Sequence, residues 1–95
     1  MKEYEIVYVF RPDLSDEDRS KKIERIHGLI TEGGGEIEKT DDWGKRTLAY
    51  EIDHYPEGYY GLTLFQLPPQ GVNLVKERLN IDEEILRYQI VVRST

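Results

Sequence analysis

Residues 2–35, KEYEIVYVF-RPDL-S-DEDRSKKIERIHGLITE-GGG, contain the strand and helix from which the rest of the fold follows. Alternate residues of Lys2–Phe10 share one face of a strand, and on that face lie Tyr4, Ile6, Tyr8 and Phe10. Pro12 ends the strand, because proline lacks the N–H that a sheet ladder needs. Ser15 with Asp18 three residues later is typical of a helix N-terminus. The glycine triplet at 33–35 should end this helix, which we expect over residues 16–32.

The remaining sequence predicts three strands and a short helix. The strand Glu36–Ile52 is longer than the usual 5–6 residues, so a bulge or bend is expected near Gly44. Breakers at residues 54–58 predict a turn, followed by a strand at 59–67, a helix over about 70–79 and a strand at 85–93. The order β-α-β-β-α-β predicts a ferredoxin-like α+β sandwich, a four-stranded antiparallel sheet with two helices on one face. Right-handed crossovers place the first and third strands in the centre.

Composition narrows the class of protein. The 95 residues are typical of a single domain, 1–95. The absence of cysteine excludes disulfides, thiol nucleophiles and cysteine-ligated metals, and favours the cytoplasm. No apolar run approaches the ~20 residues of a membrane helix, so we expect no membrane partner. Thirteen basic and nineteen acidic residues give a net charge of −6, which is not typical of a stand-alone nucleic-acid binder.

Catalysis has little support in the sequence. His27 falls on the first helix and His54 in a turn, and neither has a carboxylate or hydroxyl at a suggestive spacing. Asp41 and Asp42 lack the pattern of a calcium loop. Gly44, which precedes Lys45 and Arg46, lacks the other residues of a phosphate-binding loop. We therefore expect no enzyme activity, no cofactor and no metal.

Basic and aromatic residues allow RNA binding, although the aromatic residues of the third strand are also those of an ordinary central strand filled with β-formers. The third strand carries GYYGLTLF at residues 58–65, where an RNA-recognition motif would stack bases, although its outward positions turn aliphatic after Tyr60. Neighbouring first and last strands could bring Lys2, Arg87 and Arg93 into one small edge patch. Lys45 and Arg46 follow two aspartates and could equally form internal ion pairs of little worth.

Several motifs together resemble a known family. They are YE at residues 4–5, GKRTLAYEI at 44–52, GYY at 58–60 and ILRY at 85–88. In register over almost the whole chain, they resemble the bacterial small-subunit ribosomal protein six family. The resemblance implies a structural, ribosome-associated protein of the small subunit. It further implies binding to the central domain of the small-subunit ribosomal RNA with the small basic ribosomal protein eighteen as partner, which would supply the missing positive charge.

The resemblance also assigns residues to roles. Lys2, Tyr4, Arg87 and Arg93 occupy positions where family members touch RNA or its surroundings. A hairpin region linked with partner and RNA contacts contains Lys45, Arg46, Leu48, Tyr50 and His54. His54 stands where a lysine is common, so a phosphate contact there would depend on pH or be absent.

The sequence leaves three alternatives open. The chain could instead be an autonomous RNA-recognition-type binder that stacks a base on Tyr60. An acylphosphatase-like enzyme on the same fold would need a phosphate-cradling loop after the first strand, where only Arg11 is available. Weak self-association of the free protein through the uncovered sheet also remains open.

Overall fold

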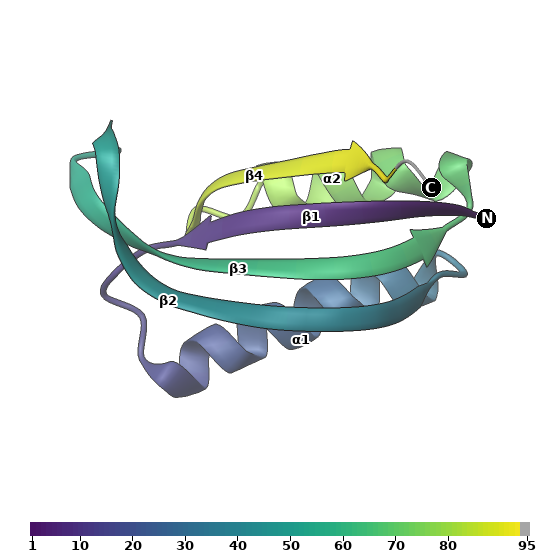
Figure 1. Cartoon of the computed structure of the whole chain (residues 1–95), viewed down its shortest axis with the longest axis horizontal. Coiled ribbons are helices and arrows are strands. Elements are labelled where there is room, and N and C mark those ends of the chain that lie inside the picture. The colour runs from purple at the N-terminus through teal and green to yellow at the C-terminus, as the bar shows by residue number, and fades with distance from the viewer. Residues whose placement is uncertain (94–95) are drawn as a thin grey trace.

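A computed structural model describes residues 1–93 and has the predicted order of elements. The elements are β1 (Lys2–Phe10), α1 (Asp16–Glu32), β2 (Glu36–Ile52), β3 (Tyr55–Leu67), the 3-10 turn η1 (Pro69–Gly71), α2 (Val72–Asn80) and β4 (Ile85–Val92). The sheet order is β2-β3-β1-β4 with every neighbouring pair antiparallel (Figure 1). The ferredoxin-like prediction is therefore confirmed, including the central positions of β1 and β3.

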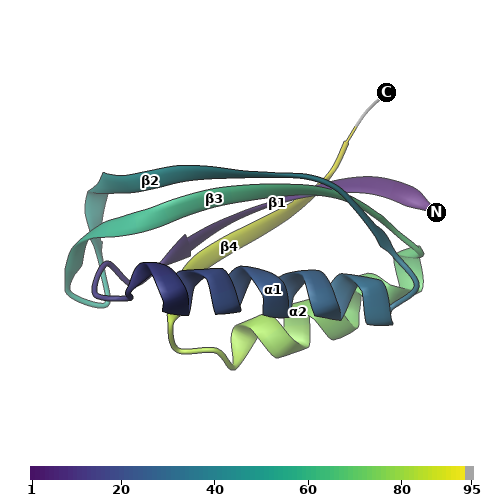
Figure 2. The ribbon, with the colours of Figure 1, turned by 90° about the horizontal axis from the view of Figure 1, so that it is seen from below.

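Both helices cover the same face of the sheet (Figure 2). The predicted face of β1 packs against them, with Ile6 and Tyr8 fully buried and Phe10 2% exposed. The helices contribute Ile26 and Ile30 from α1, and Val75 and Leu79 from α2. Each pair is spaced by four residues, so one stripe of each helix closes the core. The opposite face of the sheet is left uncovered by the described elements.

The ends of α1 follow from the local sequence. Ser15 Oγ accepts a hydrogen bond from the backbone N–H of Asp18 at 3.1 Å, as the cap motif predicts. At the other end the left-handed residue is Gly34, with φ of 89°, whereas Gly33 has an ordinary φ of −79°. Gly35 N–H then donates to Ile30 O at 2.9 Å, which satisfies a carbonyl of the last turn. The glycine triplet therefore ends the helix through its second member.

The β2–β3 hairpin differs from the predicted turn. The connection consists of Asp53 and His54, whose positive φ values of 49° and 69° are those of a tight two-residue turn. Tyr55 already begins β3, so the predicted turn at residues 54–58 is wrong beyond its first residue. The bulge expected near Gly44 is confirmed by its φ of 77° and by a register shift between Asp42 and Gly44. Figure 1 shows the hairpin projecting past the end of β1.

An ion cluster joins α1 to the loop between α2 and β4. Lys22 Nζ lies 2.7 Å from Asp82 Oδ2 and 2.8 Å from Glu84 Oε1. The side chain of Asp82 is only 7% exposed, and its Oδ1 also accepts from the Glu84 backbone N–H at 3.0 Å. These contacts fix where β4 begins relative to α1.

Candidate nucleic-acid interface

The uncovered face of the sheet has an apolar centre. Directly paired residues on neighbouring strands point to the same side. Val7 on β1 is paired with Leu62 on β3 and with Gln89 on β4. In the next row, Glu5 is flanked by Leu64 and Val91. The outward positions after Tyr60 are therefore aliphatic, as the sequence indicated.

At one end of this face, Arg93 is engaged by carboxylates. Its Nη1 donates to Glu38 Oε2 at 2.8 Å and lies 4.0 Å from Glu3 Oε2. Gln66 Nε2 also donates to Glu38 Oε1 at 2.9 Å. The hydrogen bonds from Gln66 and Arg93 lower the pKa of Glu38. Glu38 of β2, Gln66 of β3, Glu3 of β1 and Arg93, which follows β4, thus form a polar row across the sheet.

Arg87 lies at the opposite end of β4. Arg87 pairs with Val9, whereas Arg93 follows Val92, which pairs with Tyr4. Six residues of strand separate the two arginines by about 20 Å. The single edge patch of Lys2, Arg87 and Arg93 is therefore wrong. Lys2 and Arg93 lie at one end, where both line a shallow depression, and Arg87 belongs to a separate site.

The second site combines Arg87 with the base of the hairpin. Arg87 Nη2 donates to the hydroxyl oxygen of Tyr50 at 2.9 Å, and its Cζ lies 5.5 Å from the Tyr50 ring centroid. The Tyr50 hydrogen bond raises the pKa of Arg87, so its charge is secure. Tyr50 is nevertheless 61% exposed, whereas Leu48 is 8% exposed beneath it. With Tyr60, these residues line a hollow of about 70 Å³.

The other residues predicted for the hairpin region have different surroundings. Lys45 Nζ lies 5.2 Å from the ring centroid of Tyr59, and Arg46 Nε donates to the carbonyl oxygen of Trp43 at 3.3 Å. Neither cation forms an ion pair within residues 1–93, so the ion-pair alternative is wrong. His54 occupies the turn itself and is exposed.

Tyr4 does not face the candidate interface. Its side chain is 5% exposed and belongs to the core cluster between sheet and helices. The ring stacks on Phe65 with centroids 5.6 Å apart. A direct RNA contact by the Tyr4 ring is therefore not available in this structure, because its alternation with Ile6 puts it on the covered face.

A partly buried chain of hydrogen bonds was not foreseen from the sequence. His27 Nε2 lies 2.9 Å from Thr40 Oγ1, and Thr40 Oγ1 lies 3.2 Å from Thr63 Oγ1. Thr63 Oγ1 is in turn 3.0 Å from the hydroxyl oxygen of Tyr8. Burial lowers the pKa of His27, while Glu24 opposes that shift. His27 thus joins α1 to the sheet from the edge of the apolar stripe of the helix, and the threonine at an inward position of β2 was the available signal.

Fold and surface together define a small ferredoxin-like α+β domain. It presents an uncovered sheet face, a projecting hairpin and cations at two separate places. Across residues 1–93 no group of three or more His, Asp or Glu side chains is arranged to hold a metal ion. Within that same range, the helices are too short or too polar to cross a membrane.

Comparisons with known proteins identify the family. A family model described as ribosomal protein S6 matches residues 3–92. The small ribosomal subunit protein bS6 of Thermoanaerobacter pseudethanolicus is 46% identical over 91 residues, covering 96% of both chains. That of Caldanaerobacter subterraneus subsp. tengcongensis is 45% identical with the same coverage. The crystal structure of 30S ribosomal protein S6 from Thermotoga maritima has a TM-score of 0.93 at 30% identity, covering 97% of this chain and 87% of that chain.

The chain belongs to the ribosomal protein S6 family. It is a ribosome-associated protein of the small subunit, and it is not an enzyme.

Proposed function

We propose that this protein binds the central domain of the small-subunit ribosomal RNA together with ribosomal protein eighteen, as a single domain in the bacterial cytoplasm. The pairing of Arg87 with Tyr50 carries the proposal. It holds a guanidinium beside a largely exposed aromatic ring, and no carboxylate of residues 1–93 forms an ion pair with Arg87. A cation held beside a ring that can stack on a base is a combination typical of RNA-binding surfaces.

Lys2 and Arg93 would contribute differently from Arg87. Arg93 is already hydrogen-bonded to Glu38, so a phosphate contact there requires exchange of one anion for another. Lys2 is exposed and is in no ion pair within the described chain, so it is free to approach a phosphate directly. We therefore expect Arg87 and Lys2 to contribute more to the affinity for RNA than Arg93 does.

The uncovered sheet face supports a basic protein partner. Its apolar centre, Val7 with Leu62 and Leu64, can be desolvated by a partner, and carboxylates of Glu5 and Asp41 lie beside it. Carboxylates on this face attract and orient a cationic protein. That partner would also reduce the repulsion between RNA and a chain of net charge −6.

The test measures binding of the junction RNA with and without protein eighteen over a series of salt concentrations. We expect tight binding only with the partner present. Lys2→Ala and Arg87→Ala should each weaken binding and reduce the salt slope by about one. Lys21→Ala is the matched control, because Lys21 is an exposed lysine of α1.

Two results would contradict the proposal. Unchanged affinity and salt slope in the combined Lys2, Arg87 and Arg93 alanine variant would exclude these cations as contacts. Nanomolar capture of the RNA by the protein alone would favour the autonomous binder that uses Tyr60.

A further inference from the structure

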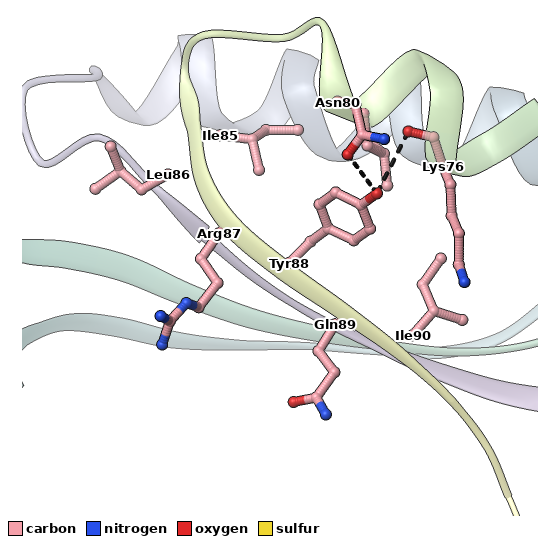
Figure 3. Close-up of a pocket in the computed structure, with 9 residues that line it drawn as sticks. Lys76, Asn80, Ile85, Leu86, Arg87, Tyr88, Gln89 and Ile90 are labelled. Atoms are coloured by element: carbon pink, nitrogen blue, oxygen red, sulfur yellow. Dashed lines mark hydrogen bonds between the residues drawn. The ribbon is translucent and has the colours of Figure 1, made fainter. Parts of the chain in front are cut away.

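A groove runs between α2 and the edge strand β4. It has a volume of about 560 Å³, within the range of pockets that hold small ligands. Figure 3 shows Ile85, Tyr88 and Ile90 on the helix side of β4, with Arg87 and Gln89 on the other side. The groove therefore opens along the strand edge, where a bound molecule can meet side chains from both faces.

Polar groups on the helix side are oriented by one hydrogen bond. The Tyr88 hydroxyl donates to Asn80 Oδ1 at 2.6 Å, and it also lies 3.4 Å from the Lys76 carbonyl oxygen (Figure 3). Because Oδ1 is occupied, the amide of Asn80 can offer its two Nδ2–H donors to a ligand. Lys76 adds an ammonium group that forms no ion pair with any described residue.

The electrostatics of the groove are opposite to those of the whole chain. Its lining contains two cations, Lys76 and Arg87, and no carboxylate, although the protein carries a net charge of −6. Asp82 and Glu84 lie in the adjoining loop, where Lys22 of α1 pairs with both carboxylates and offsets one of their two negative charges. An anion entering the groove therefore meets hydrogen-bond donors and positive charge.

The proposal rests on the RNA-binding function proposed above and extends it to residues outside the hairpin. We propose that a single strand of the RNA runs along the β4 edge, with phosphates on Lys76 and Arg87. The Nδ2–H donors of Asn80 bind an acceptor of a ribose or a base between them. The groove is continuous with the Arg87–Tyr50 site, because Arg87 lines both.

A protein segment added as a fifth strand is the competing occupant. β4 offers a free edge of eight residues with Arg87 as its only charged side chain, and open edges of this kind can accept strands. Lys76 and Asn80, however, lie on α2 beside the edge, and a purely backbone ladder would leave their donors unused. The cationic lining therefore favours the nucleic acid.

The test uses Lys76→Glu and Asn80→Asp in the complex with RNA and protein eighteen. Asn80→Asp keeps an oxygen for Tyr88 and replaces the donors by a negative charge. Loss of one charge-assisted contact should weaken RNA binding roughly tenfold or more. Lys76→Glu should also reduce the salt slope by about one. The control is Lys21→Glu on α1, and thermal unfolding verifies that each variant is folded.

The outcomes distinguish failure of the proposed RNA-binding function from failure of the groove assignment alone. If the wild-type complex fails to bind RNA, the proposed function fails and this site fails with it. If wild-type binds but both variants match Lys21→Glu in affinity and salt slope, only the groove assignment is overturned. Protection of β4 backbone amides by the protein partner alone, unaffected by Lys76→Glu, would overturn it in favour of strand addition.

Discussion

Replacing Lys22 by methionine should destabilise the fold severely. Lys22 Nζ donates to both carboxylate oxygens of Asp82, at 3.0 and 2.7 Å, and it also reaches Glu84. The side chains of Lys22 and Asp82 are 16% and 7% exposed, whereas that of Glu84 is 41% exposed. Methionine preserves most of the aliphatic packing, so the change mainly leaves the Asp82 carboxylate buried without its cation.

The size of the effect follows from this burial. Removing one partner of a buried pair costs about 3–5 kcal/mol, and the Glu84 contact adds little because it is exposed. We take about 3 kcal/mol, since Lys22 keeps some contact with water. For a domain of this length that lowers Tm by roughly 12–24 °C.

Urea unfolding of a double-mutant cycle measures the effect. Asp82→Asn keeps the oxygen that accepts from the Glu84 N–H while removing the charge. The double variant Lys22→Met/Asp82→Asn should recover at least half of the loss caused by Lys22→Met alone. The reasoning is refuted if Lys22→Met costs under about 0.5 kcal/mol, the scale of an exposed pair, or if the two substitutions are additive.

The same cluster gives stability a dependence on alkaline pH. Burial alone would lower the pKa of Lys22, but hydrogen bonds to Asp82 and Glu84 raise it above the ordinary value. The stabilisation is complete below the ordinary lysine pKa of about 10.4 and is lost as pH rises through the folded value. This loss should be absent in Lys22→Met.

Two further predictions concern stability. Because burial lowers the pKa of His27, the unfolded chain binds more protons, and unfolding free energy should fall as pH drops below about 6.5. Urea titrations at several pH values should show a flatter profile for His27→Gln, and an identical profile would contradict the role of burial. Gly35→Ala should destabilise strongly in thermal unfolding, because its Cβ would collide with the Gln66 carbonyl oxygen. Gly28→Ala has open space within α1 and should instead stabilise by about 0.5–1 kcal/mol; equal effects of both substitutions would be incompatible with the packing described.

The fold was predictable because its signals are local. Ser15 and the glycine triplet delimit α1, and alternation identifies the buried face of β1. The hairpin turn was missed because Pro56 and Gly58 look like breakers. β3 pairs with β1 only from Tyr59 onward, and on the other side Pro56 lies at a register shift between β2 and β3. It can therefore stand in β3 without a missing ladder bond.

The candidate site was less predictable, for two reasons. Tyr4 was assigned by resemblance, although its alternation with Ile6 already placed it on the covered face. The contact between Arg93 and Glu38 spans non-adjacent strands that are 55 positions apart, so no periodicity could indicate it. The spacing of Arg87 and Arg93 along one strand direction already implies a separation of about 20 Å.

The antiparallel pairing of β1 with β4 has a mechanical consequence. Tyr4 is paired with Val92, so the first residues of β1 and the last residues of β4 lie at the same end of the sheet (Figure 1). Tension applied between these two strand ends would pull β1 and β4 apart perpendicular to their length. The hydrogen bonds between the strands would then break one after another. Separating the strands in this way requires far less force than shearing them along their length, because in shear all the hydrogen bonds bear the load together. The protein should therefore yield at low force when stretched from its termini.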